Sequence, residues 1–117
     1  MKYEEIFSMA KETFMKSDVS NIDGHLAIQV NIIGEGEGAF YVELKDRKLY
    51  VEPYEYFDRD LKLIATAKDF LNIANGKLDS IWAYTTGKLK IEGDLGKAME
   101  LQKIIKSIKK EEKKKSS

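Results

Sequence analysis

The sequence predicts an α+β fold: a five-stranded, mainly antiparallel sheet with helices covering one face. Stretches with the two-residue alternation of strands and stretches with the helical period follow one another as helix, three strands, strand, two helices, strand, helix. The first three strands are separated only by short turns, which is typical of an antiparallel meander. Such a sheet can bury one face against helices and leave the other face to water.

The chain begins with an amphipathic helix and a first strand. Residues 3–16 place large apolar side chains near one side of a helix. After a loop at 18–24, residues 25–33 alternate Leu, Ile and Val with smaller or polar side chains, which predicts a strand. The GEGEG stretch at 34–38 predicts a turn, because closely spaced glycines supply the positive φ angles that hairpins require.

Two further strands complete the meander. Residues 39–45 and 48–54 are both rich in strand-forming side chains and are joined by a tight turn at 46–47. Pro53 has no N–H to donate to a neighbouring strand. The third strand is therefore expected at an edge of the sheet or to end at this proline.

The middle of the chain passes from a strand into two helices. Residues 61–67 predict the fourth strand, and 67–75 a helix that ends before Gly76. Residues 78–86 predict a second short helix with Asp79 or Ser80 as its N-cap.

The end of the chain is predicted to form a strand, a helix and a charged segment. Residues 88–93 predict the fifth strand, and Asp94 is expected to cap the last helix. The helix carries one broad apolar stripe made of Ala98, Met99, Leu101, Ile104, Ile105 and Ile108. Residues 109–117 have no apolar side chain, so we expect one domain over 1–108 followed by a charged flexible tail.

The composition excludes several classes of function. Twenty Lys and Arg balance twenty Asp and Glu, which disfavours nucleic acid as a partner. Without cysteine the chain can form no disulfide and no zinc–thiolate site. The N-terminal residues lack the apolar core of a signal peptide, and no later run is long enough to cross a bilayer, so a cytoplasmic protein is expected.

The closely spaced glycines near the end of the chain do not form a nucleotide-binding motif. A phosphate-binding loop would need glycine where Ile91 stands and a hydroxyl where Ala98 stands. Gly93 and Gly96 are better explained by the passage from the last strand into the last helix. No cofactor is expected.

No group of residues predicts catalysis or metal binding. His25 is the only histidine, and no G-x-S-x-G motif accompanies it. Glu35 and Glu37 could approach a cation, but the turn supplies too few ligands for calcium. We therefore predict no catalytic residue, no metal site and no enzymatic activity.

The apolar side chains of the later helices leave two interpretations open. They are numerous for a small sheet, and they can form either a filled core or an apolar pocket between the sheet and the helices. A filled core would suit an interaction or regulatory module.

Two stretches resemble the sterol carrier protein-2 (non-specific lipid-transfer) domain family. They are DRDLKLIATAKDFLNIANGKLD at 58–79 and AYTTGKLKIEGDLGKAMELQ at 83–102. The second is similar to the family pattern A-aromatic-x-x-G-K-L-K-I-x-G-[DN]-x-x-x-A-M-x-L, and the earlier meander fits the family only in its pattern of strands. The resemblance implies binding and carrying of a lipid or fatty acyl chain in an apolar tunnel, without a chemical step.

The resemblance also suggests which residues contact the ligand. The expected lining is Phe70, Ile73, Ile81, Trp82, Met99, Leu101 and Ile105. Trp82 is bulkier than the residue usual there, and Ser80, Thr85 and Thr86 also depart from the family pattern. A lysine of the final strand or helix is expected to meet an anionic head group.

The expected partners follow from this interpretation. They are a lipid or fatty acyl ligand and, through the lysines of the last helix, a transient contact with a membrane surface. A monomer or weak homodimer is expected. The C-terminal residues are not a peroxisomal S-K-L signal.

Overall fold

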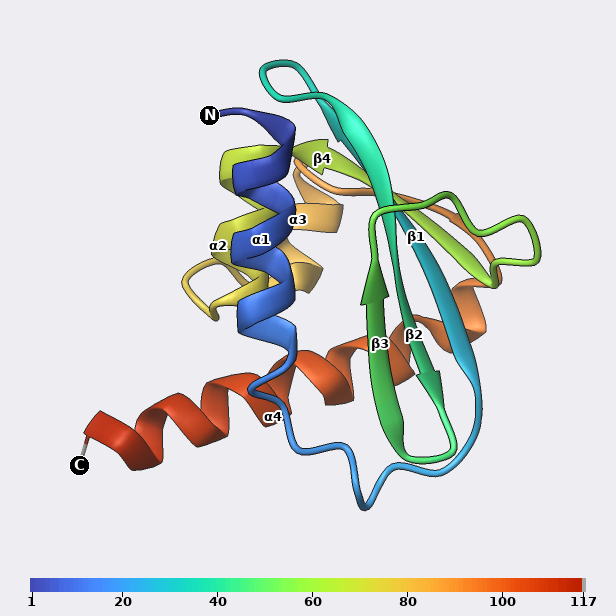
Figure 1. The fold of residues 1–117 in the computed structure, drawn as a ribbon, viewed down its shortest axis with the longest axis vertical. Helices are drawn as coiled ribbons and strands as arrows, with labels where there is room; N and C mark the ends of the chain where they lie inside the picture. The colour runs from blue at the N-terminus through green and yellow to red at the C-terminus, as the bar shows by residue number, and fades with distance from the viewer. Residues whose placement is uncertain (117) are drawn as a thin grey trace.

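Five strands form one sheet, and the helices lie against one of its faces (Figure 1). The structure, a computed structural model, describes the backbone of residues 1–116 and the side chains of residues 1–108. In chain order the elements are α1 (Tyr3–Phe14), β1 (Leu26–Ile33), β2 (Gly38–Lys45), β3 (Lys48–Glu52), β4 (Leu61–Thr66), α2 (Ala67–Ala74), α3 (Ser80–Thr85), β5 (Lys90–Gly93), the 3-10 helix η1 (Leu95–Lys97) and α4 (Ala98–Ser116). The predicted α+β class is confirmed.

The sheet has the strand order β3-β2-β1-β4-β5. Three of its four pairings are antiparallel, and β1 pairs with β4 in parallel. Strand β3 lies at an edge and ends just before Pro53, as the missing N–H of proline predicts. The turn between β2 and β3 holds Asp46 and Arg47 at φ angles of 53° and 62°, which suit a two-residue hairpin.

The later elements differ from the prediction mainly at their ends. Asp79 is the N-cap of α3, since its Oδ1 accepts hydrogen bonds from the N–H groups of Ile81 and Trp82. Asp94 caps η1 rather than the last α-helix, because one 3-10 turn precedes Ala98. Helix α4 continues past residue 108 to Ser116. The side chains of residues 109–116 and the whole of residue 117 lie outside the described part of the chain. The flexible tail predicted for 109–117 therefore stays a prediction.

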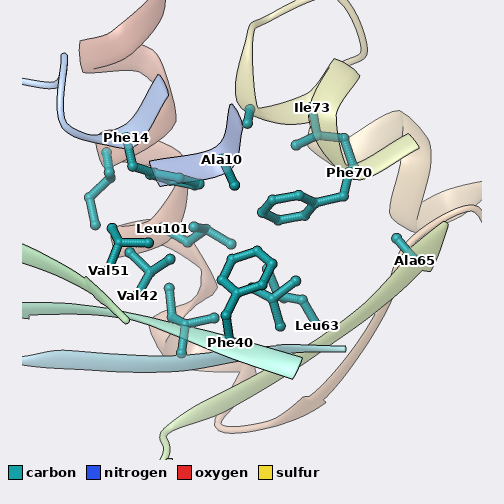
Figure 2. Packing of buried hydrophobic residues seen from close by; sticks show 14 of the residues in the cluster. Ala10, Phe14, Phe40, Val42, Val51, Leu63, Ala65, Phe70, Ile73 and Leu101 are labelled. Carbon is teal, nitrogen blue, oxygen red and sulfur yellow. The ribbon is translucent and has the colours of Figure 1, made fainter. Parts of the chain in front are cut away.

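The core lies between the sheet and the helices (Figure 2). The Phe70 ring from α2 meets the Phe40 ring from β2 edge-on, with the centroids 5.6 Å apart, and lies 6.1 Å from the Phe14 ring of α1. Leu101 brings α4 into the same core. Helices α1, α2 and α4 therefore all contribute to one apolar layer on one face of the sheet.

The opposite face of the sheet is partly covered by the connection at 53–60. This loop lies on the side away from α1 and α2 (Figure 1). Gln29 Oε1 accepts hydrogen bonds from the Tyr56 N–H at 3.1 Å and from Arg59 Nη1 at 3.4 Å. Ala27 and Gln29, which alternate with the apolar residues of β1, are both buried although they point away from the helices. The loop that leads to β4 passes over this face of the sheet.

Candidate functional site

An open apolar groove of about 170 Å³ lies between α3, β5 and the start of α4. Three uncharged polar residues, Ser80, Tyr84 and Gln102, form part of its lining. The apolar lining residues are Ile81, Leu89, Ile91, Leu95, Ala98, Met99 and Leu101. No charged residue is part of the lining, so the groove suits an apolar group.

Short local motifs position the walls of the groove. The Asp79 cap starts α3, which buries Ala83 in the core and turns Ile81 and Tyr84 towards the groove. The N–H of Leu89 donates to the carbonyl of Ala83, which brings the chain back towards β5. Leu89, just before β5, and Ile91, within it, are two residues apart, and both line the groove.

The groove has a buried floor and an exposed rim. Leu89 and Leu101 are only 2% and 4% exposed, and both also belong to the core. Ile81, Leu95 and Met99 are each more than half exposed. Apolar side chains exposed next to one another in this way often mark a site of interaction.

The structure brings together three of the seven residues predicted as ligand-lining. Ile81, Met99 and Leu101 line the groove. Phe70 and Ile73 are instead buried in the core.

The other two predicted residues also lie outside the groove lining. Trp82 is exposed one position further round α3, and Ile105 packs against the core further along α4. Leu89 and Ile91 of the lining were missed, although the alternation in residues 88–93 already carried the signal.

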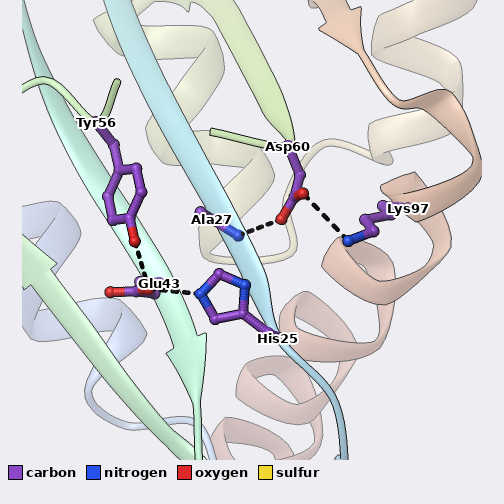
Figure 3. A network of polar contacts seen from close by, with 6 residues as sticks. All are labelled: His25, Ala27, Glu43, Tyr56, Asp60 and Lys97. Carbon is purple, nitrogen blue, oxygen red and sulfur yellow. Dashed lines mark hydrogen bonds and ion pairs between the residues drawn. The ribbon is translucent and has the colours of Figure 1, made fainter. Parts of the chain in front are cut away.

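A polar cluster lies on the face of the sheet opposite the helices (Figure 3). His25 Nε2 is 2.6 Å from Glu43 Oε2, and the same oxygen accepts a hydrogen bond from the Tyr56 hydroxyl at 2.8 Å. The hydrogen bond to Glu43 raises the pKa of the Tyr56 hydroxyl above its ordinary value, and the partial loss of water around the hydroxyl adds to this effect. The cluster ties the 53–60 loop to β1 and β2, and it contains no activated nucleophile.

A second polar contact connects the sheet with the wall of the groove. Asp60 Oδ2 accepts a hydrogen bond from the Ala27 N–H at 2.8 Å, and Asp60 Oδ1 lies 3.1 Å from Lys97 Nζ (Figure 3). Burial by itself raises the pKa of the Asp60 carboxyl, but the hydrogen bonds from Ala27 and Lys97 and the positive charge of Lys97 lower it below the ordinary value. The pair fixes the 3-10 turn that leads into α4.

Two negative findings, on metal ligands and on membrane-spanning helices, apply to the described part of the chain. Among its side chains, no three His, Asp or Glu residues are placed to hold a metal ion together. None of its helices combines the length and the apolar character needed to span a bilayer.

The fold and the groove define a small α+β domain with an open apolar site, and its family is identified by sequence. The sequence model of the SCP-2 sterol transfer family matches residues 5–106. The chain belongs to this family, which confirms the resemblance seen in its late motif.

The relatives of the chain include a much longer protein. Hydroxysteroid dehydrogenase-like protein 2 from Rattus norvegicus is 30% identical over 103 residues, which cover 87% of this chain and 19% of that protein. The chain thus spans about a fifth of the length of this relative.

Solved structures share the fold. The crystal structure of sterol carrier protein 2 like 2 from Aedes aegypti has a TM-score of 0.63 at 25% identity and covers 84% of this chain and 91% of its own. The solution structure of the palmitated Aedes protein has a TM-score of 0.64 at 24% identity, with 84% and 92% covered.

Proposed function

We propose that this chain binds the alkyl part of a lipid or fatty acid in the groove between α3, β5 and α4, and carries it without a chemical step. The observation that supports this most directly is a lining without charged residues, bounded by a half-exposed apolar rim. The Aedes protein, which shares the fold, has a solution structure in its palmitated form. Ile81, Met99 and Leu101 are the predicted residues that we propose contact the ligand.

The size of the groove indicates how binding proceeds. A methylene group occupies roughly the space of a water molecule, about 30 Å³, so a groove of about 170 Å³ covers about five or six methylenes. At about 0.8 kcal/mol each, their burial contributes about 4–5 kcal/mol before ordering costs. That corresponds at best to roughly millimolar affinity, so tighter binding requires the rim to open and cover more of the alkyl chain.

The side chains at the rim suit this opening. Met99 has three rotatable bonds and a polarisable sulfur, so it adapts to a ligand of irregular shape. It lies beside Leu95 on the solvent side of the groove, and both are more than half exposed. We propose that their movement extends the groove, and that the chain acts as a monomer that meets a membrane surface transiently.

The polar cluster of His25, Glu43 and Tyr56 does not contribute to this function. It lies on the other face of the sheet, where its hydrogen bonds connect the 53–60 loop with β2 and His25.

Displacement of an apolar fluorescent probe by palmitate tests the proposal. Met99→Lys places a charge at the rim and should weaken palmitate binding at least about tenfold, because the ammonium group resists desolvation. The matched control is Met9→Lys, a similarly exposed methionine on α1, which should leave binding unchanged. No displacement from the unaltered protein by palmitate or by a neutral lipid of the same length, together with concentration-dependent dimerisation in sedimentation, would favour the interaction module instead.

A further inference from the structure

The lining of the groove indicates the chemistry of the ligand's polar end. We propose that the chain prefers single-chain lipids with an uncharged polar end, such as a fatty alcohol or an ester, over lipids that end in a free carboxylate. This inference rests on the proposed function of the groove and narrows it to a class of ligand.

Three neutral hydrogen-bonding side chains reach the groove. Ser80 and Tyr84 lie one turn apart on α3, and Gln102 faces them from α4. None of the three side chains makes a hydrogen bond within the part of the protein whose side chains are described. Together they offer both donors and acceptors to a hydroxyl or an ester carbonyl.

The lysines on the α4 side of the groove are already paired with acids. Lys97 Nζ lies 3.1 Å from Asp60, and Lys103 Nζ lies 3.4 Å from Glu100. Lys90 alternates with Ile91 on β5, so its side chain points away from the groove. A carboxylate that enters the groove would therefore lose part of its water without gaining a counter-charge from these residues.

The cost of such a charge decides between the two ligand classes. Removing an ionised carboxylate from water without a partner costs several kcal/mol, whereas a hydroxyl that regains a hydrogen bond loses little. The carboxylate of Asp79, next to Ser80 at the start of α3, adds a negative charge near one end of the groove. The electrostatic environment thus favours a neutral end.

The test compares three ligands in the same probe-displacement assay on the full chain. At about pH 8, where a carboxylate is ionised, hexadecanol and methyl palmitate should bind at least about tenfold tighter than palmitate. Gln102→Leu and Tyr84→Phe should each weaken the binding of the alcohol about three- to tenfold and so reduce its advantage over palmitate. Thr85→Val, which removes a hydroxyl from α3 outside the groove, should change neither.

Other outcomes would overturn the inference. If palmitate binds as tightly as hexadecanol and Lys88→Gln weakens it, the polar end is anionic and is held by the exposed lysine before Leu89. The proposed function would then still stand. If none of the three ligands displaces the probe, the proposed function fails as well. The comparison of ligands uses the unaltered protein, so it does not depend on the folding of any variant.

Discussion

At the scale of single residues, Asp60 joins parts of the chain that are far apart in sequence. Its N–H donates to the carbonyl of Ala27, and its own carbonyl accepts from the N–H of Asp94. Its carboxylate meets the N–H of Ala27 and the ammonium of Lys97. One residue therefore ties β1, the start of β4 and the turn before η1 together. This role could not be predicted from the sequence, because the partners of Asp60 meet only in the folded sheet.

The charge of Asp60 makes stability depend on pH. Its pKa in the folded protein lies below the ordinary value of 3.8, so its contribution is complete above that value and is lost as the pH falls through the lower, folded pKa. Asp60→Asn should lower the free energy of unfolding by about 1–2 kcal/mol at neutral pH and reduce the loss of stability in acid. Urea unfolding at a series of pH values measures both effects.

Asp58→Asn provides the matched control for this prediction. Asp58 is exposed and makes no hydrogen bond or ion pair within the described side chains. Its substitution should change stability by less than about 0.5 kcal/mol. An equal effect of the two substitutions would contradict the role assigned to Asp60.

At the scale of elements, the tip of the β1–β2 hairpin packs against the start of α1. The terminal ammonium of Met1 lies 2.9 Å from Glu35, and the Tyr3 hydroxyl donates to the carbonyl of Ala39. Gly36 has a φ of +75°, and a Cβ added there would collide with Ile6 Cδ1 and lie 2.6 Å from the carbonyl oxygen of Met1. The hairpin thus fits the helix only with glycine at this position.

Two neighbouring glycines separate the effect of backbone conformation from that of packing. Gly36→Ala should destabilise the protein by about 2–4 kcal/mol, since it combines an unfavourable φ with a collision. Gly34→Ala has a similar φ of +81° but nothing within 4 Å, so it should cost only about 1 kcal/mol. Thermal unfolding of the two variants measures the difference, and equal losses would show that the contact with α1 is not formed.

The elements themselves were largely predictable, because their signals are local. The alternation in 39–45, the proline after β3 and the Asp79 cap each act within a few residues. The 3-10 turn at Leu95–Lys97 was not predicted, since an N-cap aspartate precedes either kind of helix. The burial of Gln29 was missed because it depends on a loop that is distant in sequence.

At the scale of the whole molecule, the interior of the core and the exposed rim of the groove are built from different apolar side chains. The resemblance to the family predicted an apolar tunnel, but sequence alone could not show which apolar side chains fill the core. Phe70 packs on Phe40 and Phe14, and Ile73 is buried in the same core. Ile81 and Met99 remain at the surface. Apolar character is the same in both places, and only the packing of distant elements distinguishes them.

This separation predicts different effects for two substitutions in α4. Ile104 is fully buried, so Ile104→Ala should lower the free energy of unfolding by about 2–5 kcal/mol. Met99→Ala should change stability by less than about 0.5 kcal/mol, yet weaken ligand binding by removing part of the rim. Denaturant unfolding and probe displacement, measured on both variants, distinguish the two roles; a large loss of stability in Met99→Ala would place it in the core.

The groove is built from one continuous piece of chain, since its lining residues all fall between Ser80 and Gln102. Most of the scaffold that supports it is supplied by earlier residues. Under the proposed function, ligand preference can therefore diverge in evolution by changes within this segment, while the rest of the domain is inherited unaltered. A chimaera that exchanges only this segment with that of a relative should acquire the relative's choice of lipid.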